Sequence, residues 1–109
     1  MTVLSVIEQA IRSRTPIRFQ YIREGKDPGA RMGHPHAVFL RRLKAGGEHV
    51  YLHLWQTGGV TDSGEALPSW RQFLLNDISD PVLDQGDRPF PIATGYNPVS
   101  YEHPIAMVR

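Results

Sequence analysis

One hexapeptide, residues 50–55, constrains the fold of this chain more than any other segment, because its aliphatic and polar or aromatic residues alternate strictly. A β-strand directs successive side chains to opposite faces of its sheet. One face of this strand would carry Val50, Leu52 and Leu54. The other would carry groups that stack or form hydrogen bonds, namely His49, Tyr51, His53 and Trp55. We predict that the aliphatic face packs in a core and that the polar face is a candidate ligand surface.

The rest of the sequence changes from a helical to an alternating pattern. Apolar residues recur at helical spacing over about residues 2–14, which predicts an amphipathic helix that Pro16 prevents from continuing. Glycine-rich stretches at about residues 24–33 and 57–68 are predicted loops. Alternation predicts strands at about residues 17–22, 36–43, 48–56 and 69–75, with a brief last strand at 82–83. The Gly-Gly turn between the second and third strands indicates an antiparallel hairpin.

One helix followed by about five short strands favours an α+β fold that is mainly β, with a small, strongly bent antiparallel sheet or open barrel. The 109 residues suffice for one domain, which we place at residues 1–84. Residues 85–109 are predicted to form an extended proline-rich tail without regular elements. Its larger apolar residues should pack on the body or dock on a partner chain, and they are Phe90, Ile92, Tyr96 and Tyr101.

Composition excludes several classes of function. The formal net charge is only +1, from 12 Lys and Arg against 11 Asp and Glu, so no overall field draws the chain to nucleic acid or to an anionic membrane. Any anion site must be a local cluster. The chain has no cysteine, which excludes disulfides and thiol catalysis and fits a reducing cytoplasm. We find no signal-peptide pattern and no apolar run of membrane-spanning length, and therefore expect a soluble, cytoplasmic protein without a membrane partner.

Three collinear segments resemble the WYL domain, a small Sm/SH3-like barrel of bacterial transcriptional regulators and some CRISPR-associated proteins. The first is the helix together with residues 10–21. The second is Arg31 with Pro35 and residues 38–40, and the third is residues 50–52 with residues 71–78. Departures from the family pattern are Val50, where a tryptophan is usual, and Leu74 and Asp77, where many members have basic residues. The resemblance extends over about residues 3–84.

This resemblance implies a ligand-binding regulatory domain rather than an enzyme. WYL domains usually sense a ligand, often single-stranded nucleic acid or a nucleotide-like anion, and pass the signal to an attached DNA-binding module. Only one helix precedes the predicted barrel, so we expect regulatory output here to need a regulatory protein partner or a homo-oligomer. The alternative is an Sm/SH3-like structural or protein-interaction module that self-associates without a small ligand.

Four residues are the predicted ligand-binding site. The resemblance places Arg31 and Arg71 at basic positions of the family, and guanidinium groups suit phosphate because they donate paired hydrogen bonds in a planar fork. Tyr51 and His53 would add hydrogen bonds and a stacking surface for a base. The competing interpretation is that Arg71 pairs with a nearby carboxylate and that Tyr51 only packs.

No catalytic or cofactor site is expected. Ser63, Ser69 and Ser79 lack a glycine elbow, and no glycine-rich stretch precedes a helix as a phosphate-binding loop would. Four histidines could approach one another, namely His34, His36, His49 and His53. The last two, however, lie about 13 Å apart along one strand, too far to share a metal ion. We therefore expect no enzyme activity, no metal and no cofactor.

Overall fold

The chain begins with helix α1, Val3–Ser13, in the computed structural model, which describes residues 1–62, 64–86 and 88–109. Thr2 and Ser5 form a reciprocal capping box at its start, and Arg14 ends it in a left-handed conformation with φ 51°. The helix buries Val6, Ile7, Ala10 and Ile11 against the sheet. No helix among the described residues has the length and apolarity that crossing a membrane requires. The predicted helix is thus confirmed.

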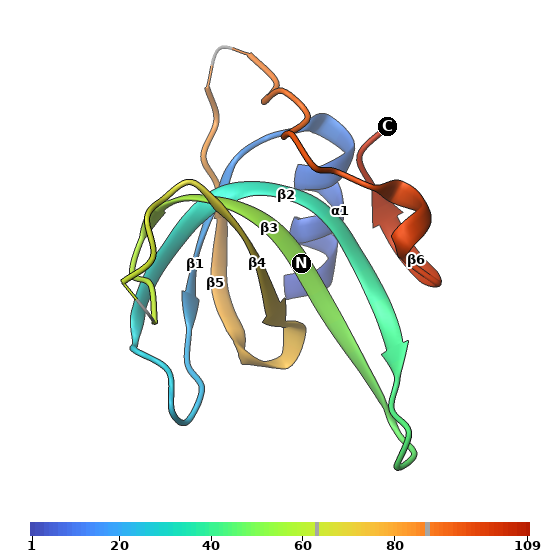
Figure 1. Cartoon of the computed structure of the whole chain (residues 1–109). Coiled ribbons are helices and arrows are strands. Elements are labelled where there is room, and N and C mark those ends of the chain that lie inside the picture. The colour runs from blue at the N-terminus through green and yellow to red at the C-terminus, as the bar shows by residue number, and fades with distance from the viewer. Residues whose placement is uncertain (63, 87) are drawn as a thin grey trace.

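An antiparallel sheet follows the helix, with the short 3-10 helix η1, Leu75–Asp77, between its fourth and fifth strands (Figure 1). Its strands are β1 Ile17–Tyr21, β2 Gly29–Arg42, β3 Glu48–Gly59, β4 Ser69–Leu74, β5 Ile78–Leu83 and β6 His103–Met107. Their order is β4-β3-β2-β1-β5, and β6 pairs separately with β2. Among the described strands, β4 and β5 are the two ends of this order and do not pair with each other, so the sheet is not closed into a barrel. The predicted α+β fold, mainly β with one N-terminal helix, is confirmed, as is the hairpin between β2 and β3.

Strand β2 organises the sheet because it is long enough to pair with two different strands along one edge. Its first part pairs with β1, from Tyr21 opposite Gly29 to Ile17 opposite Gly33, and its later part pairs with β6. Register shifts against β3 interrupt the middle of β2, and such bulges bend a strand. Figure 1 shows β2 and β3 arching together over the molecule.

Residues 29–33 were predicted as part of a loop, and that prediction is wrong because they belong to β2. Gly33 serves close packing of backbones rather than a turn, because a Cβ atom there would overlap the carbonyl oxygen of Trp55 on β3. Gly59, at the end of β3, does the same from the other strand, since its Cβ would overlap the carbonyl oxygen of Ala30. Glycine inside a strand often marks such a close approach.

The core lies between α1 and the concave face of the sheet. Leu52 and Leu54 are fully buried there, which confirms the predicted aliphatic face of the hexapeptide, and Val50 packs at its border. The cluster also includes Ile7, Ala10, Ile11, Ile17, Phe19, Tyr21, Val38, Phe73, Ile78, Phe90 and Val108. We call this side of the sheet the core face and the opposite side, which carries Tyr51, His53 and Trp55, the outer face.

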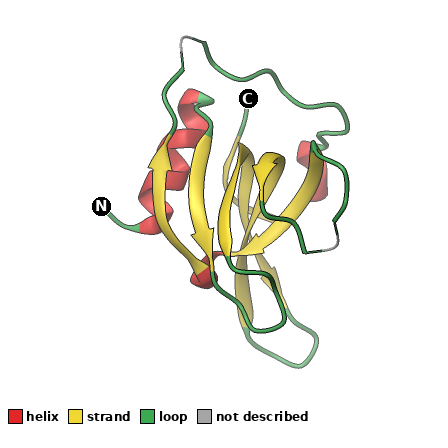
Figure 2. Ribbon diagram, turned by 90° about the vertical axis from the view of Figure 1, so that its left-hand side faces the viewer, coloured by secondary structure: helices red, strands yellow, loops and turns green. Residues whose placement is uncertain are grey.

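The C-terminal tail folds back onto the same chain. After β5 it crosses over one end of the molecule, passes through the short 3-10 helix η2, Pro98–Ser100, and ends in β6 (Figure 2). Phe90 and Tyr101 are buried, whereas Ile92 is 46% exposed. The prediction of a tail without regular elements is wrong, because β6 tolerates Pro104 at a register shift against β2. Proline is accepted at such irregular sheet edges.

Candidate ligand-binding site

Cross-strand register separates the four predicted site residues onto two faces of the sheet. Residues directly opposite each other on antiparallel strands share a face. Arg71 lies opposite Leu54, so it belongs to the core face, while Tyr51 and His53 belong to the outer face. Arg31 lies opposite Phe19 and is therefore also on the core face. The structure brings the two arginines to one side and does not bring Tyr51 and His53 to them.

Arg31 is the largest fully buried side chain among the described residues, with 1% of its surface exposed. Its guanidinium carbon lies 5.6 Å from the ring centroid of Tyr21 and 5.7 Å from that of Phe73, within cation–π range of both rings. Its Nη2 donates to the carbonyl oxygen of Asp27 at 2.6 Å and to Oδ1 of Asp62 at 3.1 Å. Asp62 thus supplies the counter-charge that a buried guanidinium needs.

The Asp62 carboxylate accepts from more than one donor. Its Oδ1 also accepts from the backbone N–H of Asp27 at 3.1 Å, and its Oδ2 lies 3.7 Å from Nζ of Lys26. Burial alone would raise the pKa of Asp62, but the bonds from Arg31 and Asp27 outweigh burial and hold that pKa below its ordinary value. Guanidinium, amide and ammonium groups therefore converge on one oxyanion. We call Arg31, Asp27 and Lys26 the anion cradle.

Arg71 also pairs with a carboxylate of the connection between β3 and β4. Its Nη2 lies 3.0 Å from Oε2 of Glu65, with the two side chains 20% and 58% exposed. The competing interpretation, in which Arg71 pairs with a nearby carboxylate, describes the geometry observed. Sequence reasoning missed Lys26, Asp27, Asp62 and Glu65. The sequence marks these four residues only as charged residues inside glycine-rich loops, and charged side chains in such loops are usually just solvated.

A sequence model of the WYL domain family matches residues 2–83, which is most of the chain. The chain belongs to the WYL domain family. The match confirms the resemblance seen in the sequence and extends from α1 through β5, so both arginines and the anion cradle lie within it. The family is one of regulatory, ligand-sensing domains. No curated protein and no solved structure matches the chain.

On the outer face of this WYL domain, the tail engages His53. The Nδ1 atom of His53 lies 2.6 Å from the hydroxyl oxygen of Tyr101, and its ring centroid lies 4.6 Å from that of Trp70. Burial lowers the pKa of His53 to about 4 and raises the pKa of Tyr101 to about 12. A neutral imidazole and a neutral hydroxyl therefore share this hydrogen bond. Tyr51 packs on Phe39, with their ring centroids 5.9 Å apart.

A second imidazole of the WYL domain fastens the tail. The Nε2 atom of the fully buried His36 accepts from the backbone N–H of Ala93 at 3.0 Å, and its Nδ1 lies 2.8 Å from the carbonyl oxygen of His34. These contacts fix the neutral tautomer with the proton on Nδ1. Burial lowers the pKa of His36 accordingly. In the described part of the chain, no group of three or more metal-ligating residues could hold a metal ion.

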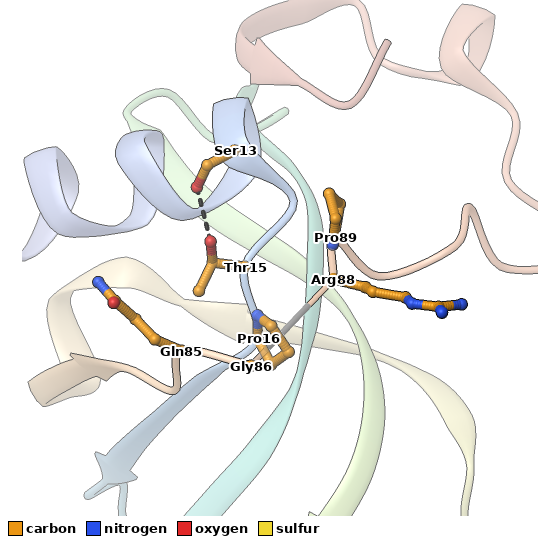
Figure 3. Close-up of a pocket in the computed structure, with 7 residues that line it drawn as sticks. All are labelled: Ser13, Thr15, Pro16, Gln85, Gly86, Arg88 and Pro89. Atoms are coloured by element: carbon orange, nitrogen blue, oxygen red, sulfur yellow. Dashed lines mark hydrogen bonds between the residues drawn. The ribbon is translucent and has the colours of Figure 1, made fainter.

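One cavity of about 220 Å³ lies between the end of α1 and the segment after β5 (Figure 3). It is lined by Ser13, Thr15, Pro16, Gln85, Gly86, Arg88 and Pro89. The Ser13 and Thr15 hydroxyl oxygens lie 2.7 Å apart, and Figure 3 shows the Arg88 side chain pointing away from them. None of the four predicted site residues lines this cavity. Ser63, which the sequence analysis considered as a nucleophile, lies outside the described residues.

Proposed function

We propose that this WYL domain is a regulatory sensor of a nucleotide-like anion or of single-stranded nucleic acid, which it binds on the core face through Arg31 and Arg71. The observation that carries this proposal is the anion cradle, where Arg31, the Asp27 amide and Lys26 surround one carboxylate. A phosphate oxygen makes the same demands as a carboxylate oxygen, namely charge and several N–H donors.

The packing around Arg31 supports this role. Its guanidinium is held by the Tyr21 and Phe73 rings, so little rotational freedom remains to be lost when an anion binds. Arg71, one-fifth exposed, would supply a second positive charge nearer to solvent. The same proposal includes a cytoplasmic location, control of transcription and output through a protein partner. It includes no catalytic step.

Binding of labelled decathymidylate and of cyclic AMP by purified protein tests the proposal. Arg71→Ala should retain the parent's circular dichroism spectrum and weaken binding about fivefold or more, because it removes one charge-assisted contact. Arg12→Ala is the matched control, since Arg12 is an arginine on α1 whose side chain is 71% exposed. Affinity of the parent should also fall as salt is raised. Absence of binding by the parent, or equal affinities for both variants, would remove this function.

The open sheet favours a second candidate, a module that self-associates. In the described fold, β4 pairs only with β3 and β5 only with β1, so each leaves one strand edge available for pairing with another chain. Light scattering across a hundredfold range of protein concentration distinguishes this candidate. A monomer throughout the range would count against self-association.

A further inference from the structure

Both arginines of the core face are paired with carboxylates from one short segment. Asp62 pairs with Arg31 and Glu65 pairs with Arg71, and both acids lie in the connection between β3 and β4. The start of that connection is fastened to the sheet. The buried Gln56 donates from Nε2 to the carbonyl oxygen of Val60 at 2.9 Å, and the Val60 N–H donates to the carbonyl oxygen of Ala30 at 2.9 Å. Asp62 follows only two residues later.

We propose that Asp62 and Glu65 are internal stand-ins for the ligand, and that the ligand is an anion with at least two acidic groups that displaces both carboxylates. This inference rests on the proposed function and specifies its ligand class and its regulation. Without ligand, the domain pairs each arginine with a carboxylate of its own chain. Binding then exchanges one set of ion pairs for another.

The geometry at Arg31 indicates that Asp62 does not use all the hydrogen-bond donors that the guanidinium group offers to an anion. Nε and Nη2 form one edge of a guanidinium group, and a bidentate oxyanion accepts from both. Of these two Arg31 nitrogens, Nη2 alone donates to Asp62, and it also donates to the Asp27 carbonyl oxygen. Arg31 Nε is buried and has no hydrogen-bond partner among the described residues. A phosphate group that accepted from both nitrogens would satisfy the Nε–H that Asp62 leaves without a partner.

Exposure indicates that the carboxylates can leave. The side chain of Glu65 is 58% exposed and that of Asp62 is 21% exposed, whereas that of Arg31 is 2% exposed. Water can therefore solvate the displaced acids, while the guanidinium of Arg31 stays in place. Exposed ion pairs contribute little to stability, so an incoming anion loses little affinity by breaking the Glu65 pair and more by displacing Asp62.

The test measures binding of labelled decathymidylate and of inorganic pyrophosphate to the parent and to Asp62→Asn/Glu65→Gln. Removal of internal competitors raises the fraction of molecules that can bind, and apparent affinity rises with that fraction. We expect the double variant to bind about tenfold more tightly than the parent. The matched control, Asp84→Asn/Glu102→Gln, makes the same change in net charge at two exposed positions outside the connection between β3 and β4. This control should bind about twofold more tightly than the parent or less, because it changes only the overall electrostatic field of the protein.

Each result has one meaning. If the parent binds and both double variants bind equally tightly, the stand-in inference is overturned while the proposed function remains. If no protein binds either probe, the proposed function fails and this inference fails with it. Glu65→Gln alone keeps the buried Asp62 pair and therefore the fold, and it should tighten binding about two- to threefold. Preference for decathymidylate over pyrophosphate would identify nucleic acid as the source of the acidic groups, and the reverse preference would identify a free phosphate compound.

Discussion

The hydroxyl oxygen of Tyr101 on the tail lies 2.6 Å from Nδ1 of His53 on β3, and the two groups form a hydrogen bond. The tail thereby covers part of the face that the alternation of residues 50–55 presents as a ligand surface. Tyr101 itself is 8% exposed and packs against Phe39. The outer face of β3 is consequently covered by the tail at His53. Arg31 and Arg71 lie on the core face, on the other side of the sheet.

Tyr101→Phe should destabilise the protein by about 1 to 2 kcal/mol, because a half-buried imidazole nitrogen loses its hydrogen-bond partner while the phenyl ring still packs. Urea unfolding followed by tryptophan fluorescence measures this change. Tyr51→Phe is the control, since no hydrogen bond of the Tyr51 hydroxyl is found among the described residues, and it should change stability by less than about 0.5 kcal/mol. Equal effects of the two substitutions would contradict the assignment.

Stability should decrease as the pH falls from about 6.5 to about 4. Burial, together with smaller contributions from the nearby His36 and Arg41, lowers the pKa of His53 from 6.5 to about 4 in the folded protein. Across this interval the unfolded chain binds a proton that the folded chain does not, so stability rises with pH. We expect the free energy of unfolding to fall by about 2 kcal/mol over this interval, after allowance for screening, because His53 is partly accessible to solvent. His53→Phe should flatten the profile measured by urea unfolding at several pH values, and an unchanged slope would count against this source of acid sensitivity.

Arg31→Lys should destabilise the protein by about 2 kcal/mol, although the charge is kept, because an ammonium group replaces neither the planar fork nor the contact with two rings. Arg41 provides a matched comparison. Its guanidinium carbon also lies over two rings, 5.5 Å from the Phe39 centroid and 5.2 Å from that of Tyr51, but the residue is exposed. Arg41→Lys should cost about 0.5 kcal/mol or less. Thermal unfolding of both variants at one pH measures the two losses of stability. Similar losses would show that the burial of Arg31 is not what makes its replacement by lysine costly.

The elements that sequence reasoning predicted are those whose cause is local. Helix α1 follows from apolar spacing and a proline stop, and the β2–β3 hairpin follows from alternation around a glycine turn. The Arg31–Asp62 pair joins residues 31 positions apart in segments without periodicity, so no local pattern could indicate it. Strand β6 was hidden because Pro104 disfavours a strand, and only the free edge of β2 makes it pair there. The separation of Arg71 from His53 depends on strand register, which the sequence of either strand alone does not specify.

Gly33→Ala should be among the most damaging single-methyl substitutions in the chain. A Cβ there would overlap the Trp55 carbonyl oxygen and lie 2.9 Å from Cα of Gln56, and both obstacles are backbone atoms of a paired strand that cannot rotate away. We expect a loss of about 2 kcal/mol or more, since overpacking of a rigid interior forces the strands apart. Gly58→Ala lies in the same pair of strands, but its new Cβ would meet only the flexible Met32 side chain, at 3.6 Å from sulfur. It should therefore change stability by about 0.5 kcal/mol or less. Chemical denaturation of the two variants compares them directly, and equal stability would show that β2 and β3 do not approach as closely at Gly33 as the structure places them.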